Sequence, residues 1–157
     1  MERIEIQSEE LPIEIDVIRE ESDLVHGITA EILAEFLSET MKPYNDNLED
    51  SLKGVKDALN GKPGKGGFIL LATQDRKPIG SLVMLATGMS GYIPEYILLF
   101  VAVSPKMRGM GIGSKFINLA KKHTDGKIKL HVEYDNPAKR LYEKHGFISK
   151  YAEMRFE

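Results

Sequence analysis

The sequence lacks cysteine altogether. That absence excludes disulfides, cysteine-containing zinc sites, iron–sulfur clusters and a cysteine nucleophile, and it fits a reduced, intracellular setting. The sequence also lacks an excess of either charge, since 21 basic and 24 acidic residues give a formal net charge of −3. Without a strongly basic field, we expect neither nucleic acid nor an anionic membrane as a partner.

Long hydrophobic runs are absent too. The longest, residues 96–103, has eight residues, far below the roughly 18–20 that span a bilayer. The acidic opening, residues 1–5, lacks the basic start and apolar stretch of a signal peptide. The four histidines show no H-x-x-x-H or His–carboxylate pair at ligand spacing, so we expect no metal site. These absences together predict a cytoplasmic protein.

The length and composition suit one globular unit. A domain usually has about 100–200 residues, and 157 residues with 42% hydrophobic side chains supply an ordinary core. We therefore expect residues 1–157 to form a single domain.

Hydrophobic periodicity predicts the elements of the first half. Apolar and charged residues alternate over 3–7 and 13–19, which predicts two strands, or one broken at Pro12. Apolar residues recur at helical spacing over 23–40 and 47–59, and Asn47 is placed to cap the second helix. Residues 61–67 hold four glycines and a proline, but no lysine there precedes Ser or Thr, so they predict a flexible connection and not a phosphate loop.

The second half predicts a sheet with crossovers. A hairpin is expected from strands 68–73 and 79–87, followed by a continuously apolar strand, 95–104, that is covered on both faces. A helix around Ile112, a strand 127–134, a helix 137–145 and a strand 147–156 complete the chain. Strands interleaved with helices predict an α/β (α+β) protein with at least one parallel β–helix–β crossover.

The most informative stretch is a glycine-rich turn after the apolar strand. Gly109, Gly111 and Gly113 alternate where the next helix must begin. Glycine lets the backbone approach a ligand, and the first turn of a helix presents unpaired N–H groups, so the turn suits an anion such as phosphate. Arg108 adds a fixed positive charge there. The dinucleotide pattern G-x-G-x-x-G is not met. A turn without a ligand, and a nucleotide-phosphate site, stay open at this point.

Two motifs then make a resemblance specific. The sequence from Arg108 to Gly113, RGMGIG, resembles the R/Q-x-x-G-x-G/A motif of the GNAT N-acetyltransferase superfamily. Residues 136–147, NPAKRLYEKHGF, are similar to its second motif, N-x-x-A-x-x-x-Y-x-x-x-G-F. The order of the predicted elements over the rest of the chain also follows that family. The resemblance implies a GNAT-like fold with a mixed central sheet of six to seven strands and about four flanking helices.

The resemblance also implies acetyl-CoA as cosubstrate and no metal. In the family the pantetheine arm pairs with the backbone of the central strand, here at Val101 and Val103. The two neighbouring strands splay apart and leave a slot for the thioester, here between the ends of strands 95–104 and 127–134. Backbone amides of the turn hold the pyrophosphate. By position these amides belong to Arg108, Gly109, Met110, Gly111, Ile112, Gly113 and Ser114.

One departure from the family concerns its motif asparagine. When the second motif is anchored on Tyr142, that asparagine falls at Asp135, and Asn136 stands one residue too close. From the residues alone, Asn136 followed by Pro137 is a strong helix N-cap. The resemblance implies contact between Asn136 and the CoA arm, so both roles remain open.

Tyr142 and Glu95 are the candidate catalytic residues. From the residues alone Tyr142 is a core tyrosine of an amphipathic helix, whereas the resemblance implies that it protonates the departing thiolate of CoA. A phenol with a pKa near 10 can do so when it is hydrogen-bonded in place. Glu95 on the central strand is the candidate base, with a solvated strand end as its other interpretation. His131, Glu133 and a water chain are alternatives.

These inferences predict an acetyltransferase that moves an acetyl group to a primary amine by direct attack in a ternary complex. No acyl-enzyme is expected, because cysteine and a G-x-S-x-G serine elbow are both missing. The acceptor is a small molecule or peptide that the sequence does not name. The alternative is a CoA-binding regulatory or interaction module that keeps the fold without turnover. We expect a monomer or a homodimer.

Overall fold

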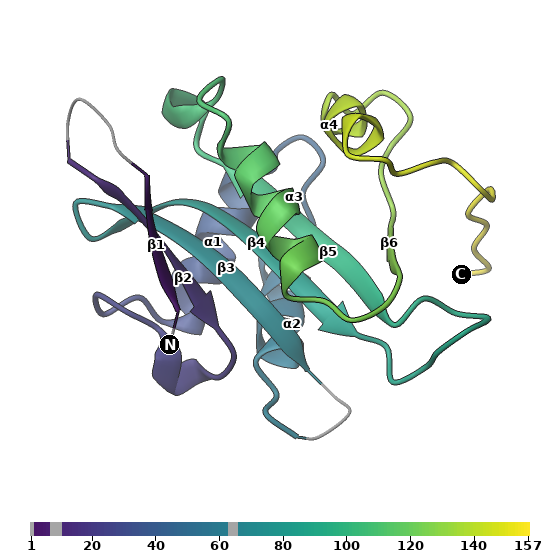
Figure 1. Cartoon of the computed structure of the whole chain (residues 1–157), viewed down its shortest axis with the longest axis horizontal. Helices are drawn as coiled ribbons and strands as arrows, with labels where there is room; N and C mark the ends of the chain where they lie inside the picture. Colours follow the sequence, from purple (N-terminus) through teal and green to yellow (C-terminus); the bar gives the residue numbers. More distant parts are fainter. Residues whose placement is uncertain (1, 7–10, 63–65) are drawn as a thin grey trace.

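The computed structural model describes residues 2–6, 11–62 and 66–157 (Figure 1). It is a mixed α/β structure with one six-stranded sheet in the order β1-β2-β3-β4-β5-β6. The strands are β1 Arg3–Ile6, β2 Ile13–Ile18, β3 Gly67–Gln74, β4 Lys77–Ala86, β5 Tyr96–Val103 and β6 Ile128–Leu130. The helices are α1 Ala30–Thr40, α2 Leu48–Ala58, α3 Ile112–Lys122 and α4 Ala138–Lys144, with short 3-10 helices η1 Glu21–Asp23 and η2 Pro105–Met107.

The sheet is antiparallel from β1 to β5, and β6 joins β5 in parallel. A parallel neighbour needs a crossover, which α3 supplies. Helices α1 and α2 cover one face of the sheet, and α3 covers the other (Figure 1). Along β3 the side chains alternate between these layers, with Phe68 and Leu70 on the α3 side and Ile69 and Leu71 on the α1/α2 side.

Several predicted elements are confirmed. Helix α2 begins after Asn47, whose side-chain Oδ1 accepts a hydrogen bond from the Asp50 amide at 2.8 Å. The predicted hairpin is the β3–β4 pair, and Asp75 and Arg76 take positive φ in its turn. Of the predicted connection 61–67, residues 63–65 lie outside the described residues.

The prediction for the first helix is wrong at its start. The structure begins α1 at Ala30 instead of residue 23. His26 and Gly27 adopt positive φ, which breaks the helical path, and the Thr29 side chain then caps α1 by accepting from the Ile32 amide.

Two predicted strands at the far end of the chain also differ. The strand expected at 127–134 shortens to β6, Ile128–Leu130. The strand expected at 147–156 is not formed, and these residues have neither helix nor strand. A strand needs a partner to satisfy its backbone groups, and no ladder between residues 147–156 and β6 occurs in the described part of the chain. The sequence of residues 147–156 was therefore not sufficient to predict a strand.

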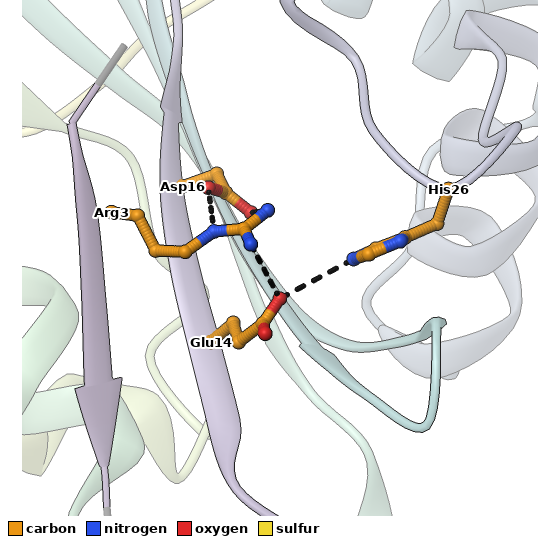
Figure 2. Close-up of polar contacts among 4 residues, drawn as sticks. All are labelled: Arg3, Glu14, Asp16 and His26. Atoms are coloured by element: carbon orange, nitrogen blue, oxygen red, sulfur yellow. Dashed lines mark hydrogen bonds and ion pairs between the residues drawn. The ribbon is translucent and has the colours of Figure 1, made fainter.

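A charge cluster ties the first strand to the sheet (Figure 2). The Arg3 guanidinium donates to both carboxylate oxygens of Asp16, at 2.8 and 3.3 Å, and Asp16 is fully buried. The same guanidinium lies 3.2 Å from Glu14, which also contacts His26 at 3.3 Å. The hydrogen bond to Asp16 raises the pKa of Arg3 above its usual value. These contacts join β1, β2 and the segment before α1.

The helices are short. None of those found in residues 2–6, 11–62 and 66–157 is long and apolar enough to cross a membrane.

Candidate active site

Strands β5 and β6 separate after only three pairs. Tyr96, Ile97 and Leu98 pair with β6, and the described residues show no pairing of β5 with β6 beyond that point. Opposite β4 the register shifts between Val83 and Met84, so that Leu99 is left over as an extra residue on β5. Such a bulge bends its strand, and β5 and β6 diverge toward α4 (Figure 1). This is the splayed slot that the resemblance implies.

The far half of β5 presents to that slot backbone groups that pair with no strand in the described part of the chain. The Ser104 amide donates to the Ile79 carbonyl of β4 at 2.8 Å. Because hydrogen-bonding directions alternate along an antiparallel strand, the backbone N–H and C=O groups of Val101 and Val103 face away from β4. The Val103 carbonyl accepts a hydrogen bond from the Arg108 side chain at 3.1 Å. Val101 and Val103 are the positions at which we expect the pantetheine arm to pair.

The glycine turn lies directly beyond β5. Gly109 and Gly111 have φ of +83° and +82°, in the left-handed region that favours glycine, and Gly111 is the N-cap of α3. The first intrahelical bond reaches the Lys115 amide. The amides of Ile112, Gly113 and Ser114 therefore have no partner inside the helix, and they lie at its positive end. This arrangement can hold a phosphate group.

The third glycine has a different role. A Cβ atom on Gly113 would lie 3.0 Å from Leu141 Cδ2, so this residue permits close packing of α3 against α4. A hydrogen bond between Ser114 Oγ and His145 Nε2, at 3.0 Å, joins the same two helices. Burial, with smaller contributions from Lys121 and Lys144, lowers the pKa of His145. The phosphate turn and the helix of the second motif are thus fixed to each other.

Tyr142 lies in the middle of α4 and is 7% exposed. Its ring stands edge-on to Phe147, with 5.9 Å between ring centroids. Burial, with a smaller contribution from Glu133, raises the pKa of Tyr142 to about 12. Its hydroxyl makes no hydrogen bond within the described part of the chain. The phenol is therefore neutral at physiological pH, and its O–H is available to a ligand.

Glu95 occupies the opposite end of β5. Its carboxylate accepts hydrogen bonds from the Lys127 amide at 2.7 Å and the Gly91 amide at 3.4 Å. The hydrogen bond from Lys127 is the largest cause that lowers the pKa of Glu95. Val101 is six positions further along the chain, roughly 20 Å at strand rise. The structure thus does not bring Glu95 together with the glycine turn.

The other candidates lie beyond the end of β6. His131 and Glu133 fall within the strand predicted over 127–134, but β6 ends at Leu130 and both side chains are exposed. Asn136 Oδ1 accepts from the Ala138 amide at 2.9 Å, and its Nδ2 donates to Glu133 at 3.0 Å. The first of these bonds is the geometry of a helix cap.

Sequence reasoning missed two contacts around the slot. The Tyr44 hydroxyl donates to the Asp135 carbonyl at 3.2 Å, and Arg108 Nη2 donates to the Thr40 carbonyl at 3.4 Å. Burial, followed by Asp135 and Glu133, raises the pKa of Tyr44. The segment after α1 is thereby joined both to the glycine turn and to the loop between β6 and α4. Tyr44 and Asp135 are 91 positions apart, and no local sequence signal marks such a pair.

Metal ligands are not grouped in this part of the molecule. Among the residues that the structure describes, no three His, Asp or Glu side chains could hold a metal ion together.

An open strand edge, a phosphate-type turn and a buried tyrosine whose hydroxyl is free in the described part of the chain are the features that we expect of an acyltransferase site. Comparison with protein families identifies the family of acyltransferases to which the chain belongs. The family described as Acetyltransferase (GNAT) domain matches residues 65–149, just over half of the chain. The chain therefore belongs to the GNAT acetyltransferases.

Solved structures show the same fold. A possible acetyltransferase from Clostridium difficile 630 is 24% identical, with a TM-score of 0.63 over 94% of this chain and 98% of that one. A ribosomal-protein-alanine N-acetyltransferase from Brucella melitensis biovar Abortus 2308 is 15% identical, with a TM-score of 0.62 over 92% and 98%. An aminoglycoside N-acetyltransferase in complex with CoA is 12% identical, with a TM-score of 0.63 over 91% and 93%. Comparison with curated proteins gives no significant match.

Proposed function

We propose that this protein transfers the acetyl group of acetyl-CoA to a primary amine, by direct attack of the amine on the thioester in a ternary complex. The observation that carries the proposal is the open edge of β5, which leads directly into the glycine turn. Acetyl-CoA has an extended arm with amide groups, followed by a pyrophosphate. The arm matches the open edge of β5, and the pyrophosphate matches the glycine turn that comes next.

The backbone supplies the sites for acetyl-CoA. The backbone N–H groups of Val101 and Val103 and the Val101 C=O, which face away from β4, suit the amides of the pantetheine arm. The amides from Arg108 to Ser114 suit the pyrophosphate, because they stand at the positive end of α3. GNAT enzymes use acetyl-CoA, and one of the structural neighbours was solved with CoA. The fit supports acetyl-CoA as the cosubstrate.

Tyr142 is the proposed proton donor. As the amine attacks and the C–S bond breaks, Tyr142 gives its hydroxyl proton to the sulfur of CoA. The proton lost from the attacking nitrogen returns to the phenolate through solvent, so the transfer balances. A pKa of about 12 keeps the donor protonated before the reaction. Burial of the side chain and the edge-on contact with Phe147 orient the Tyr142 ring.

The reaction also requires that the attacking amine lose a proton. An amine with a pKa near 10.4 is only about 0.1% neutral at pH 7.5, whereas an α-amine near 7.8 is about one third neutral. Glu95 is a poor acceptor because two backbone amides hold its carboxylate and its pKa is lowered. We therefore assign the removal of this proton to water and keep Glu95 as the alternative.

The absence of cysteine gives a clean assay. CoA carries a thiol after transfer, and the protein has none, so a thiol-reactive dye reports only the product. We expect thiol release from acetyl-CoA that depends on both the enzyme and an added amine, with an acetylated amine detected by mass spectrometry. A panel of α-amino peptides and aminoglycosides covers the acceptors named for the neighbours, and diamines extend it to other primary amines. If acetyl-CoA binds but no amine in a broad panel is acetylated, the chain is a binding module instead.

A further inference from the structure

Ser114 and His145 form a polar contact beside the glycine turn. Ser114 Oγ lies 3.0 Å from His145 Nε2, so the contact joins the third residue of α3 to the end of α4. Helical side chains lean toward the helix N-terminus, and the Ser114 hydroxyl therefore lies over the first turn of α3. Gly111, at the N-cap, has no side chain that could satisfy the free amides of that turn. The hydroxyl thus stands next to the amides that we assign to the pyrophosphate.

The backbone of His145 fixes the position of its ring. The His145 amide donates to the carbonyls of Leu141 and Tyr142, at 3.3 and 3.0 Å, and the His145 carbonyl accepts from Lys121 Nζ at 2.6 Å. The residue is half-buried. Within the described part of the chain its Nδ1 atom makes no hydrogen bond, and Nε2 bonds only to Ser114. No described contact therefore fixes which of the two nitrogens carries the proton.

A bound anion would decide the direction of the hydrogen bond between the two side chains. A serine hydroxyl has one proton, and a pyrophosphate oxygen can only accept. If Ser114 donates to the ring, its oxygen presents lone pairs to the pyrophosphate, which is unfavourable. If Nε2–H donates to Ser114 Oγ instead, the hydroxyl proton is free to point at the ligand. An anion on the turn therefore favours an imidazole that carries a proton on Nε2.

We propose that His145 is a positioning residue for acetyl-CoA: its Nε2–H donates to Ser114 Oγ, and the Ser114 hydroxyl donates to the pyrophosphate. This inference rests on the proposed function, because it requires acetyl-CoA on the glycine turn. The relay adds one side-chain donor to the backbone amides, and a hydrogen bond to a charged acceptor is roughly twice as strong as a neutral one. It acts on affinity, so the pH dependence of kcat with acetyl-CoA bound still comes from the amine.

The charges around the ring change when the pyrophosphate binds. In the free protein, burial, followed by Lys121 of α3 and Lys144 of α4, lowers the pKa of His145, so the ring is neutral at physiological pH. A pyrophosphate adds negative charge nearby and favours the protonated ring. Binding should therefore raise the pKa of His145 and take up protons from solvent at about pH 6. Because the complex then holds more protons than the free protein, affinity should rise as the pH falls through this range.

Calorimetric titration of the full chain with acetyl-CoA at neutral pH tests the relay. Ser114→Ala should weaken binding about 10–100-fold, the range for a hydrogen bond to a charged group, and His145→Leu about fivefold. His145→Gln supplies an amide donor near the position of Nε2 and should recover most of the affinity. In a Ser114→Ala background, His145→Leu should cause no further loss, because the relay acts through the Ser114 hydroxyl.

The matched control is His123→Leu. His123 is the C-cap of α3, at the opposite end of that helix, where its Nε2 lies 3.1 Å from Glu2. The control should bind acetyl-CoA as tightly as wild type, even if its melting temperature falls. If His145→Leu does not fold, Ser114→Ala and His145→Gln carry the test, because both keep the packing of α3 against α4.

Proton uptake separates the relay from a merely structural contact between α3 and α4. The titration is repeated at about pH 6 in two buffers with different ionisation enthalpies, which gives the number of protons that binding takes up. Wild type should take up more protons than His145→Gln, whose side chain does not titrate, while the phosphates of the ligand contribute equally to both. Equal uptake in the two proteins overturns the inference.

The affinities also distinguish this inference from the proposed function. If wild type binds acetyl-CoA and both His145→Leu and Ser114→Ala bind it equally well, the two side chains only hold α3 and α4 together, and this inference alone fails. If wild type does not bind acetyl-CoA, the proposed function fails and this inference fails with it.

Discussion

The chemistry of this site at the scale of single residues centres on Tyr142. Its phenol is buried, its hydroxyl has no hydrogen-bond partner in the described part of the chain, and its pKa of about 12 keeps it neutral. A raised pKa means that the proton is held at every pH below that value. The donor is therefore available throughout the physiological range, and the pH dependence of the reaction must come from the amine.

Tyr142→Phe tests this role. The change removes the proton donor and keeps the ring that packs on Phe147, so kcat should fall by about 10²–10⁴-fold while binding of acetyl-CoA is retained. Thiol release and calorimetric binding measure the two quantities. Tyr134→Phe, at an exposed tyrosine, is the matched control and should keep full activity. Equal kcat values for the two variants would show that Tyr142 is only a core residue.

The same pKa predicts the alkaline behaviour of kcat. In wild type, kcat should rise with pH as the amine loses its proton, and it should not decline through Tyr142 below about pH 11, since the phenol remains protonated there. A stopped-flow pH profile with a stable amine acceptor measures this. A descending limb near pH 9 to 10 that disappears in Tyr142→Phe would contradict the raised pKa.

Glu95→Gln separates a structural carboxylate from a catalytic base. The pKa of Glu95 is lowered in the folded protein, so its ionised form stabilises the fold above the unfolded pKa of about 4.5, and this contribution is lost as pH falls through the folded pKa. We expect a lower melting temperature at pH 7, a smaller difference from wild type below pH 4, and an unchanged pH profile of kcat/KM. Loss of activity without loss of stability would instead identify Glu95 as the base.

At the scale of elements, the two edges of β5 have different roles: one holds the sheet together and the other is proposed to bind the ligand. One edge pairs with β4 along the strand except at the bulge at Leu99, and among the described residues the other edge pairs with β6 only over Tyr96, Ile97 and Leu98. The free part of that second edge is what the proposed function uses. A substitution that removes one backbone N–H should therefore affect ligand binding at one position and stability at its neighbour.

Val101→Pro and Ala102→Pro are such a pair. At Val101 the lost N–H faces the slot, so the fold should persist while acetyl-CoA binds at least tenfold more weakly, about one hydrogen bond. At Ala102 the lost N–H belongs to the β4 ladder, so the protein should be strongly destabilised. Melting curves and calorimetry measure both. Full affinity in a folded Val101→Pro variant would show that the arm does not pair at this edge.

Strand β1 depends on a buried charge. Arg3→Met leaves the fully buried Asp16 carboxylate without its main partner and should cost about 3 kcal/mol of unfolding free energy. The double variant with Asp16→Leu removes both charges and should recover most of that loss. Urea denaturation measures the two values. If the double variant is no more stable than the single one, the cost comes from packing and not from the unpaired carboxylate.

Local signals predicted the elements that local chemistry decides. The Asn47 cap sets the start of α2, and the length and composition of the 74–78 turn predicted the β3–β4 hairpin. The start of α1 escaped prediction, because helical spacing before Ala30 does not reveal the positive φ of His26 and Gly27. The strand at 147–156 failed for a different reason, since strand formation depends on a partner edge that the sequence does not specify.

The candidate site likewise has some features that the sequence predicted and others that it did not. The glycine turn and Tyr142 were predicted because their motifs are contiguous in sequence. The bulge at Leu99, the contact between Tyr44 and Asp135, and the amide partners of Glu95 depend on pairing between distant segments. They required the structure.

At the scale of the whole molecule, the packed core and the proposed site lie in different parts of the sheet. Strands β1 to β4 and the helices on both faces form a packed core, whereas the proposed site lies where that order stops, between β5, the glycine turn and α4 (Figure 1).

The central claim is that acetyl-CoA binds the open edge of β5 and the glycine turn. Thermal denaturation with acetyl-CoA, CoA, ATP and NAD, each in wild type and in Val101→Pro, tests it most directly. Saturation at about 100 times Kd adds roughly 2.7 kcal/mol, or about 5–10 °C for a chain of this size. We predict that shift for wild type with acetyl-CoA, a smaller one for Val101→Pro, and none with NAD. Stabilisation by ATP or NAD but not by acetyl-CoA would contradict the account.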